Sequence, residues 1–236
     1  MRKSSVIIIA IVTVFVVFLG YKYFSSEESV ANPDAVTFKK EYEVLNNRIN
    51  KSNNKVYPEV NISTNNVIKY STYDELLEII KSGTGVIYLG YPECPWCRNL
   101  VPTMLMAANE VSLDTIYYLN IKEDRDLMIL DENKKVVTKK EGSKNYYELV
   151  DALSSILDDY IITTNQGEEV NIGKKRIYVP IIILIKDGKI IGHHVDTVES
   201  QKDPYVLLSD VEQEELLLKL INLMSYVSGN VCDERC

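Results

Sequence analysis

The chain is poor in basic residues, and this limits the partners that it can bind. Of its 236 residues, 26 are Lys or Arg and 34 are Asp or Glu, which gives a formal net charge of −8. A protein that binds nucleic acid neutralises phosphates with clustered Lys and Arg side chains. We therefore expect no nucleic acid as a partner.

Several sequence signatures are also missing. No internal repeat or low-complexity tract is apparent. Gly83 and Gly85 are not followed by Gly-Lys-Ser or Gly-Lys-Thr, and they precede an expected strand, which argues against a phosphate-binding loop. The chain has only two histidines, His193 and His194, and neighbours on a strand point to opposite faces. We expect both to be ordinary strand residues.

There are only four cysteines, Cys94, Cys97, Cys232 and Cys236, and they allow three kinds of site. A structural zinc site needs four ligands, and all four cysteines together could supply them. A purely structural bridge between Cys94 and Cys97 would close too short a loop to constrain the unfolded chain strongly. We favour a redox-active pair there, with no metal and no cofactor. Cys232 and Cys236 are a candidate second disulfide, and a second redox pair is the alternative.

An apolar segment opens the chain. Ser4 to Tyr21 contains 18 uncharged residues, and a helix of that length would span about 27 Å, close to the thickness of a membrane core. Basic residues precede it and acidic residues follow, which predicts a cytoplasmic N-terminus and an extracytoplasmic remainder. A signal peptide cleaved near Ala31 is the alternative. We expect a single-pass signal anchor over residues 1–24 that holds the protein in the cell membrane.

The next part of the chain changes from polar to periodic. Residues 25–60 are rich in Asn and Lys, so we expect a linker with one short helical piece. A domain is expected over residues 61–230, followed by a cysteine-containing tail over residues 231–236. Its first half contains an amphipathic helix in "STYDELLEIIKSG" and a buried strand in "GVIYLGY". A helix in "CRNLVPTMLMAANEV" and a strand in "TIYYLNI" follow, which predicts a parallel βαβ unit.

The second half begins with a charged insertion at about residues 123–176. We expect it to contain a helix over 146–157 and a hairpin in "YIITTNQGEEVNIG". Two apolar strands then flank Asp187 and Gly188, and Asp-Gly is a strong signal for a two-residue hairpin turn. An amphipathic helix over about 210–227 ends the domain.

The spacing of Cys94 and Cys97 suits thiol chemistry. Cys94 follows a strand where a helix is expected to begin, so unpaired N–H groups and the positive end of the helix dipole would favour its thiolate. Cys97, one turn later, would be recessed and able to attack a mixed disulfide on Cys94. Pro95 fits the first helical turn, where its missing N–H costs nothing.

These features resemble the thioredoxin-like fold, in the membrane-anchored or secreted form found in bacteria. The resemblance lies in "VIYLGY" before Cys-Pro-Trp-Cys, in Pro102 within the following helix, and in "YYLNI" and "YVPIIILIKDGKIIG". It implies an α/β fold of βαβ…ββα order, with a mixed sheet flanked by helices. The insertion lies between its two halves and the transmembrane helix at its N-terminus. It also implies a cis bond before Pro180, close to the cysteines, with the Val179 backbone available to substrate.

The chain also departs from the thioredoxin pattern near the cysteines. Glu93 stands where thioredoxins carry a Trp, and its charge would oppose a thiolate if it lay close. Tyr88 and Tyr118 replace the family's buried Asp and Lys, so Cys97 lacks its usual proton acceptor. We expect the helix dipole and Arg98 to stabilise the thiolate.

The resemblance implies an extracytoplasmic thiol–disulfide oxidoreductase active in cell redox homeostasis. Cys94 would be the attacking thiolate, Cys97 the resolving thiol, and Trp96, Val179 and Pro180 the contacts for substrate. Its partners would be protein thiols and disulfides, with a membrane redox partner as a further candidate, and the direction of electron flow stays open. The alternative is a non-catalytic thioredoxin-like module that recruits an export or maturation partner.

Overall fold

The computed structural model describes residues 32–164 and 166–228. The predicted signal anchor, Cys232 and Cys236 lie outside the described residues, so their roles stay predictions. In the part of the chain that is described, no helix is both long and apolar enough to cross a membrane.

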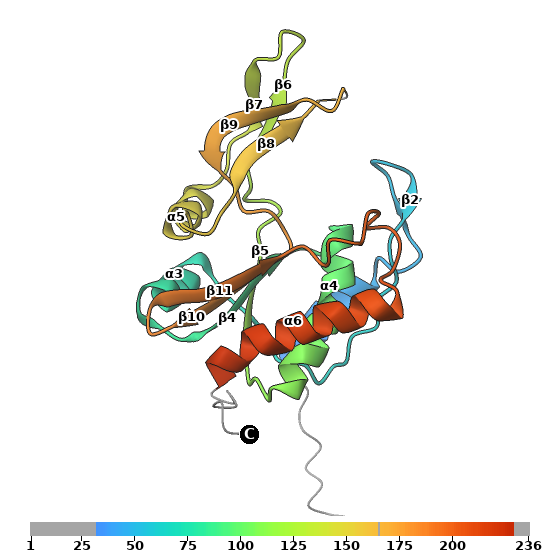
Figure 1. Ribbon diagram of the computed structural model, residues 1–236, viewed down its shortest axis with the longest axis vertical. Helices are drawn as coiled ribbons and strands as arrows, with labels where there is room; N and C mark the ends of the chain where they lie inside the picture. The colour runs from blue at the N-terminus through green and yellow to red at the C-terminus, as the bar shows by residue number, and fades with distance from the viewer. Residues whose placement is uncertain (1–31, 165, 229–236) are drawn as a thin grey trace, which may run out of the picture. The chain divides into compact units, whose positions relative to one another are not determined.

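A five-stranded mixed sheet forms the centre of the described chain (Figure 1). In spatial order its strands are β11 (Lys189–Val195), β10 (Ile181–Lys186), β4 (Gly85–Gly90), β5 (Ile116–Asn120) and β3 (Ile68–Tyr70). Strands β3, β5 and β4 run parallel to one another, whereas β10 is antiparallel to both β4 and β11. The sheet therefore has the mixed pairing and the βαβ…ββα order that the resemblance to the thioredoxin-like fold implied.

The position of β4 and β10 in the sheet explains why their sequences are continuous apolar runs. All six residues of β4 are buried, as are the first five of β10, because both strands are covered on both faces. The predicted tight turn joins β10 to β11, and Asp187 and Gly188 have positive φ values of 50° and 70°. Such values suit Asp and Gly, which explains the Asp-Gly signal.

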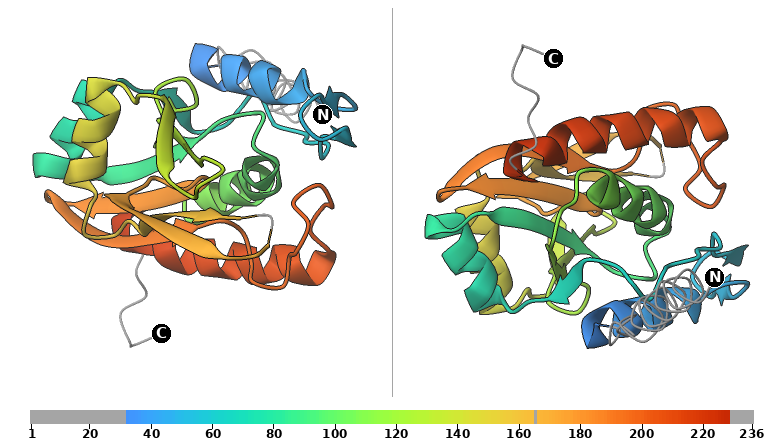
Figure 2. Two further views of the ribbon diagram at one scale, coloured as in Figure 1. Left: turned by 90° about the horizontal axis from the view of Figure 1, so that it is seen from above. Right: turned by 90° about the horizontal axis from the view of Figure 1, so that it is seen from below.

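Helices cover both faces of the sheet (Figure 2). On one face, α3 (Tyr73–Ser82) packs against α5 (Lys144–Ala152), and on the other α4 (Pro95–Glu110) packs against α6 (Asp210–Ser228). Helix α3 begins at Thr72, whose hydroxyl and the Glu75 carboxylate form a reciprocal capping box. Helix α4 connects the parallel strands β4 and β5, so the predicted βαβ unit is confirmed.

The insertion contains two hairpins in addition to α5. Its strands are β6 (Leu127–Leu130), β7 (Val136–Lys140), β8 (Asp159–Thr163) and β9 (Glu169–Lys175). A buried ion pair of 3.0 Å joins Arg176 to Asp126, and the Arg176 guanidinium lies 3.8 Å from the centre of the Tyr160 ring. These contacts tie the end of the insertion to its beginning. Helix α5 ends at Ala152, so it is shorter than the helix that the sequence predicted over residues 146–157.

The prediction that residues 25–60 form a linker is wrong for much of this segment. Residues Pro33–Glu43 form helix α2, and β1 (Ile49–Asn50) and β2 (Lys55–Val56) form a small hairpin. Phe38 and Tyr42 of α2 are fully buried, and the Phe38 ring meets Tyr118 of β5 edge-on at 4.9 Å. The polar average of this segment concealed Ala35, Phe38 and Tyr42, which recur at helical spacing on one side.

The burial of α2 predicts that it contributes to the stability of the domain. Phe38→Ala should lower the free energy of unfolding by about 3–5 kcal/mol, because it removes a fully buried ring. Val36→Ala on the same helix is the control: Val36 is 41% exposed, and its truncation should change stability by less than about 0.5 kcal/mol. Denaturant titration of both variants measures the difference. Equal effects would show that α2 does not belong to the folded core.

Candidate active site

The two cysteines lie where strand β4 gives way to helix α4. Cys94 is the residue before the helix, and its sulfur accepts a hydrogen bond from the Cys97 backbone N–H at 3.4 Å. Both thiols are free. Cys94 keeps 6% of its surface exposed and Cys97 none. The sequence therefore predicted correctly which cysteine is recessed.

The two thiols differ in acidity because of this arrangement. The pKa of Cys94 is lowered, chiefly by the hydrogen bond from the Cys97 thiol, against the opposing effect of burial. The backbone N–H groups of Cys97 and Trp96 and the charge of Arg125 lower it further. The pKa of Cys97 is raised well above its ordinary value, first by burial and then by its contacts with Cys94. Cys94 is thus the thiol that ionises first.

The segment before β10 lies next to Cys94. The Val179–Pro180 peptide bond is cis, as the resemblance to thioredoxins implied. The Val179 carbonyl oxygen lies 3.7 Å from the Cys94 sulfur. Val179 lies two residues before the start of β10 at Ile181, so its backbone lies outside the ladder of that strand. The fold thus brings Cys94, Cys97, Val179 and Pro180 together at one end of the sheet.

Glu93 precedes the first cysteine, and Trp96 lies between the two cysteines. Trp96 is partly buried against the core and keeps part of its ring accessible. The Glu93 carboxylate forms an ion pair of 2.8 Å with Lys122, which follows β5. The Lys122 charge offsets the negative charge that we expected to oppose the Cys94 thiolate.

Arg98 has a different role from the one expected. Its side chain is fully buried. Its guanidinium donates hydrogen bonds to the backbone oxygens of Pro58 and Tyr42, both at 2.7 Å, to that of Pro92 at 3.3 Å, and to Asn46 Oδ1 at 2.6 Å. Arg98 therefore fastens the chain between α2 and β3 to the beginning of α4, where the cysteines lie.

Sequence reasoning missed Arg125, which supplies the positive charge near Cys94. Its Nη1 donates to the Tyr91 hydroxyl at 3.1 Å, and its guanidinium lies 5.8 Å from the centre of that ring. Tyr91 directly follows β4, and its backbone oxygen accepts from the Cys94 N–H at 3.2 Å. No motif marks Arg125; its position shortly after β5, at the same end of the sheet as the cysteines, was the only signal.

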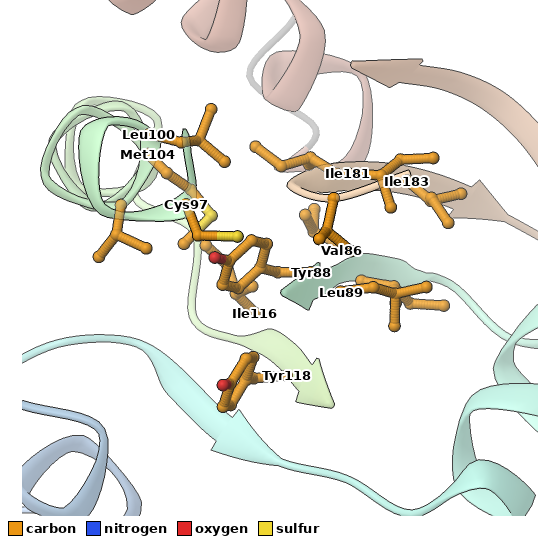
Figure 3. Close-up of a cluster of buried hydrophobic side chains, with 14 of the residues drawn as sticks. Val86, Tyr88, Leu89, Cys97, Leu100, Met104, Ile116, Tyr118, Ile181 and Ile183 are labelled. Carbon is orange, nitrogen blue, oxygen red and sulfur yellow. The ribbon is translucent and has the colours of Figure 1, made fainter. Parts of the chain in front are cut away.

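The tyrosines that replace the thioredoxin Asp and Lys form a buried pair behind Cys97 (Figure 3). Tyr88 and Tyr118 face each other across β4 and β5, and their rings stack at 5.4 Å. His193 and His194 are strand residues of β11, as expected. His193 is exposed, and a ring nitrogen of His194 lies 3.0 Å from the Thr197 backbone oxygen.

Comparison with solved structures finds similar chains, among them two plant thioredoxins. No family model and no curated protein matches the chain. The chain resembles crystal structures of thioredoxin O1 and thioredoxin O2 from Arabidopsis thaliana, both in the oxidized state, at 15% and 16% identity. Each match covers 69% of this chain, and 99% and 93% of those chains, with TM-scores of 0.34 and 0.32. At such scores, the thioredoxin-like character of the fold rests on its strand order and on the cysteines at the start of α4.

The position of Arg125 predicts the reactivity of Cys94. Removing its charge in Arg125→Gln should raise the pKa of Cys94, so less thiolate exists at a given pH below the midpoint of its titration. Alkylation of Cys94 there should slow by roughly two- to fivefold, the size of a partly screened charge interaction. Mass spectrometry of the Cys94 peptide across a pH series measures the rate. Arg125→Lys keeps the charge and should stay near wild type; a Gln variant with an unchanged pH profile would refute this role.

Proposed function

We propose that the protein is a thiol–disulfide oxidoreductase that acts on protein disulfides through Cys94, Pro95, Trp96 and Cys97. The observation that carries the proposal is the unequal pair of thiols at the start of α4. The less buried thiol, Cys94, has a lowered pKa, and the thiol behind it, Cys97, is fully buried with a raised pKa. Exchange needs such an order, because one thiolate must attack first and the second thiol must wait.

The exchange proceeds in two steps. The Cys94 thiolate attacks one sulfur of a substrate disulfide, which forms a mixed disulfide and releases the other substrate sulfur as a thiolate. Cys97 then loses its proton and attacks Cys94, so the Cys94–Cys97 bond forms and the remaining substrate sulfur leaves with the electron pair and takes up a proton. The reverse sequence oxidises a substrate. The redox potential of the pair relative to its partner decides whether the protein reduces, oxidises or isomerises.

Trp96, Val179 and Pro180 form the proposed substrate contacts. The partly accessible Trp96 ring offers an apolar surface next to Cys94. The Val179 backbone lies outside the sheet ladder, beside the sulfur that would carry the substrate. An extended substrate segment pairing with this backbone would place its disulfide at Cys94.

Trapping of intermediates tests the proposal. With Cys97→Ser, mixed disulfides between Cys94 and cellular proteins should accumulate, because no thiol remains to resolve them. The variants should also carry Cys232→Ser and Cys236→Ser, so that Cys94 is the only attacking thiol. Adding Cys94→Ser to that background is the control and should abolish the adducts. Partners recovered equally well with and without Cys94 would instead favour a non-catalytic binding module.

We also propose that the domain acts outside the cytoplasm, anchored in the cell membrane by residues 1–24. The uncharged run Ser4 to Tyr21 and the charges on either side of it support this topology. A redox partner in the membrane could then exchange electrons with the pair.

The topology predicts two results. The protein should sediment with membranes, and protease added to intact protoplasts should remove the domain. A version lacking residues 1–24 should remain inside the cell, protected from the protease. A soluble, released protein that begins near Asn32 would show cleavage and refute the anchor.

A further inference from the structure

The Tyr88 hydroxyl meets the sulfur of the buried cysteine. Tyr88 and Gly90 lie on the same face of β4, because side chains alternate along a strand. A Cβ atom at Gly90 would lie 2.4 Å from Tyr88 Oη and 3.0 Å from Cys97 Sγ. The two atoms thus converge over Gly90, which has no side chain, and a hydrogen bond from the Tyr88 hydroxyl acts to lower the pKa of Cys97. Figure 3 shows Cys97 beside the Tyr88 ring.

A second hydroxyl lies next to that of Tyr88 and is placed to orient it. Tyr42 Oη lies 2.9 Å from Tyr88 Oη, and both side chains are fully buried. Burial raises the pKa of each tyrosine well above its ordinary value, so both keep their protons. When Tyr42 donates to Tyr88, the proton of Tyr88 is free to point at Cys97, since each hydroxyl has one proton.

Cys97 needs such a donor when it reacts. Its attack on Cys94 requires the thiolate, yet its full burial raises its pKa. The titratable groups around it come from four elements and the loop after β4: Cys94 before α4, Tyr88 of β4, Tyr91, Tyr42 of α2 and Tyr118 of β5. The Tyr91 backbone N–H also donates to the sulfur. Tyr88 is the side-chain hydroxyl in this set that hydrogen-bonds to it.

We propose that the Tyr88 hydroxyl, oriented by Tyr42, is a catalytic hydrogen-bond donor that stabilises the Cys97 thiolate while it resolves the mixed disulfide. This role rests on the proposed thiol–disulfide exchange. In the step, the Cys97–Cys94 bond forms, the bond from Cys94 to the substrate sulfur breaks, and the proton lost by Cys97 is balanced by the one that the released substrate thiol gains. Tyr88 keeps its own proton throughout, because it only shares it with the Cys97 sulfur.

The first test measures the acidity of Cys97 without any turnover. In full-length protein carrying Cys94→Ser and labelled with ¹³C at cysteine, the Cys97 Cβ signal reports ionisation as pH rises. Tyr88→Phe should lower the thiolate fraction at a given pH below the midpoint by about tenfold or more, the size of a lost hydrogen bond to a charged group. Tyr42→Phe should act in the same direction and more weakly. The signal is assigned by its loss in Cys97→Ser.

Tyr118→Phe is the matched control. Tyr118 is fully buried and stacks on Tyr88, but within the described residues no hydrogen bond joins its hydroxyl to Cys97. Its removal should leave the titration of Cys97 unchanged. If Tyr88→Phe shifts the titration no more than Tyr118→Phe does, the proposal is wrong. Should Tyr88→Phe fail to fold, Tyr42→Phe decides alone, and an unshifted titration in that variant would overturn the proposal.

The second test follows the resolving step. A mixed disulfide of Cys94 with thionitrobenzoate is formed in protein carrying Cys232→Ser and Cys236→Ser, and attack by Cys97 releases the coloured thiolate. Tyr88→Phe should slow this release about tenfold near neutral pH, with the difference shrinking as pH rises. If substrates are trapped normally but the release profile of Tyr88→Phe is unchanged, the role of Tyr88 is refuted and the proposed function is not. A shifted profile without any trapped substrate would refute the proposed function and leave the hydrogen bond intact.

Discussion

The contact between the two cysteine sulfurs is the interaction on which the site depends. The Cys97 thiol donates to Cys94, and this hydrogen bond is the largest cause of the lowered Cys94 pKa. The same contact, together with burial, raises the pKa of Cys97. It exists because β4 ends just before the cysteines and α4 begins at once, so one helical turn places Cys97 behind Cys94.

The surrounding structure holds this turn in place from distant parts of the chain. Arg98 binds backbone oxygens between α2 and β3, so the first segment of the fold is fastened to the start of α4. Arg125 approaches from the chain after β5 through Tyr91, and Val179 from the end of the insertion. Stability and reactivity are therefore coupled, because loosening α2 would also loosen the backbone that positions the cysteines.

The groups around the cysteines include neutral tyrosine hydroxyls and a paired carboxylate. Tyr88 and Tyr118 place neutral hydroxyls in the core behind Cys97, and a neutral buried hydroxyl avoids the large cost of burying an unpaired charge. Glu93 is paired with Lys122, which offsets its effect on the thiolate. As a result, the acidity of Cys94 is set mainly by hydrogen bonds acting against burial, with a further contribution from the Arg125 charge, whereas burial dominates the acidity of Cys97.

The sequence alone determined the features that depend on neighbours along the chain. Strand and helix periodicity predicted the parallel βαβ unit, the last two strands of the sheet, the helices around them, and a helix and a hairpin in the insertion. Asp187 and Gly188 predicted the turn, and the spacing of Cys94 and Cys97 predicted which thiol is recessed. The similarity to thioredoxins implied the cis bond at Pro180.

Only the tertiary structure decided the burial of α2, the carbonyl contacts of Arg98, the approach of Arg125 and the meeting of Tyr88 with Cys97. Each of these joins residues from separate elements, and local periodicity records which face of an element is apolar but not which element will cover it.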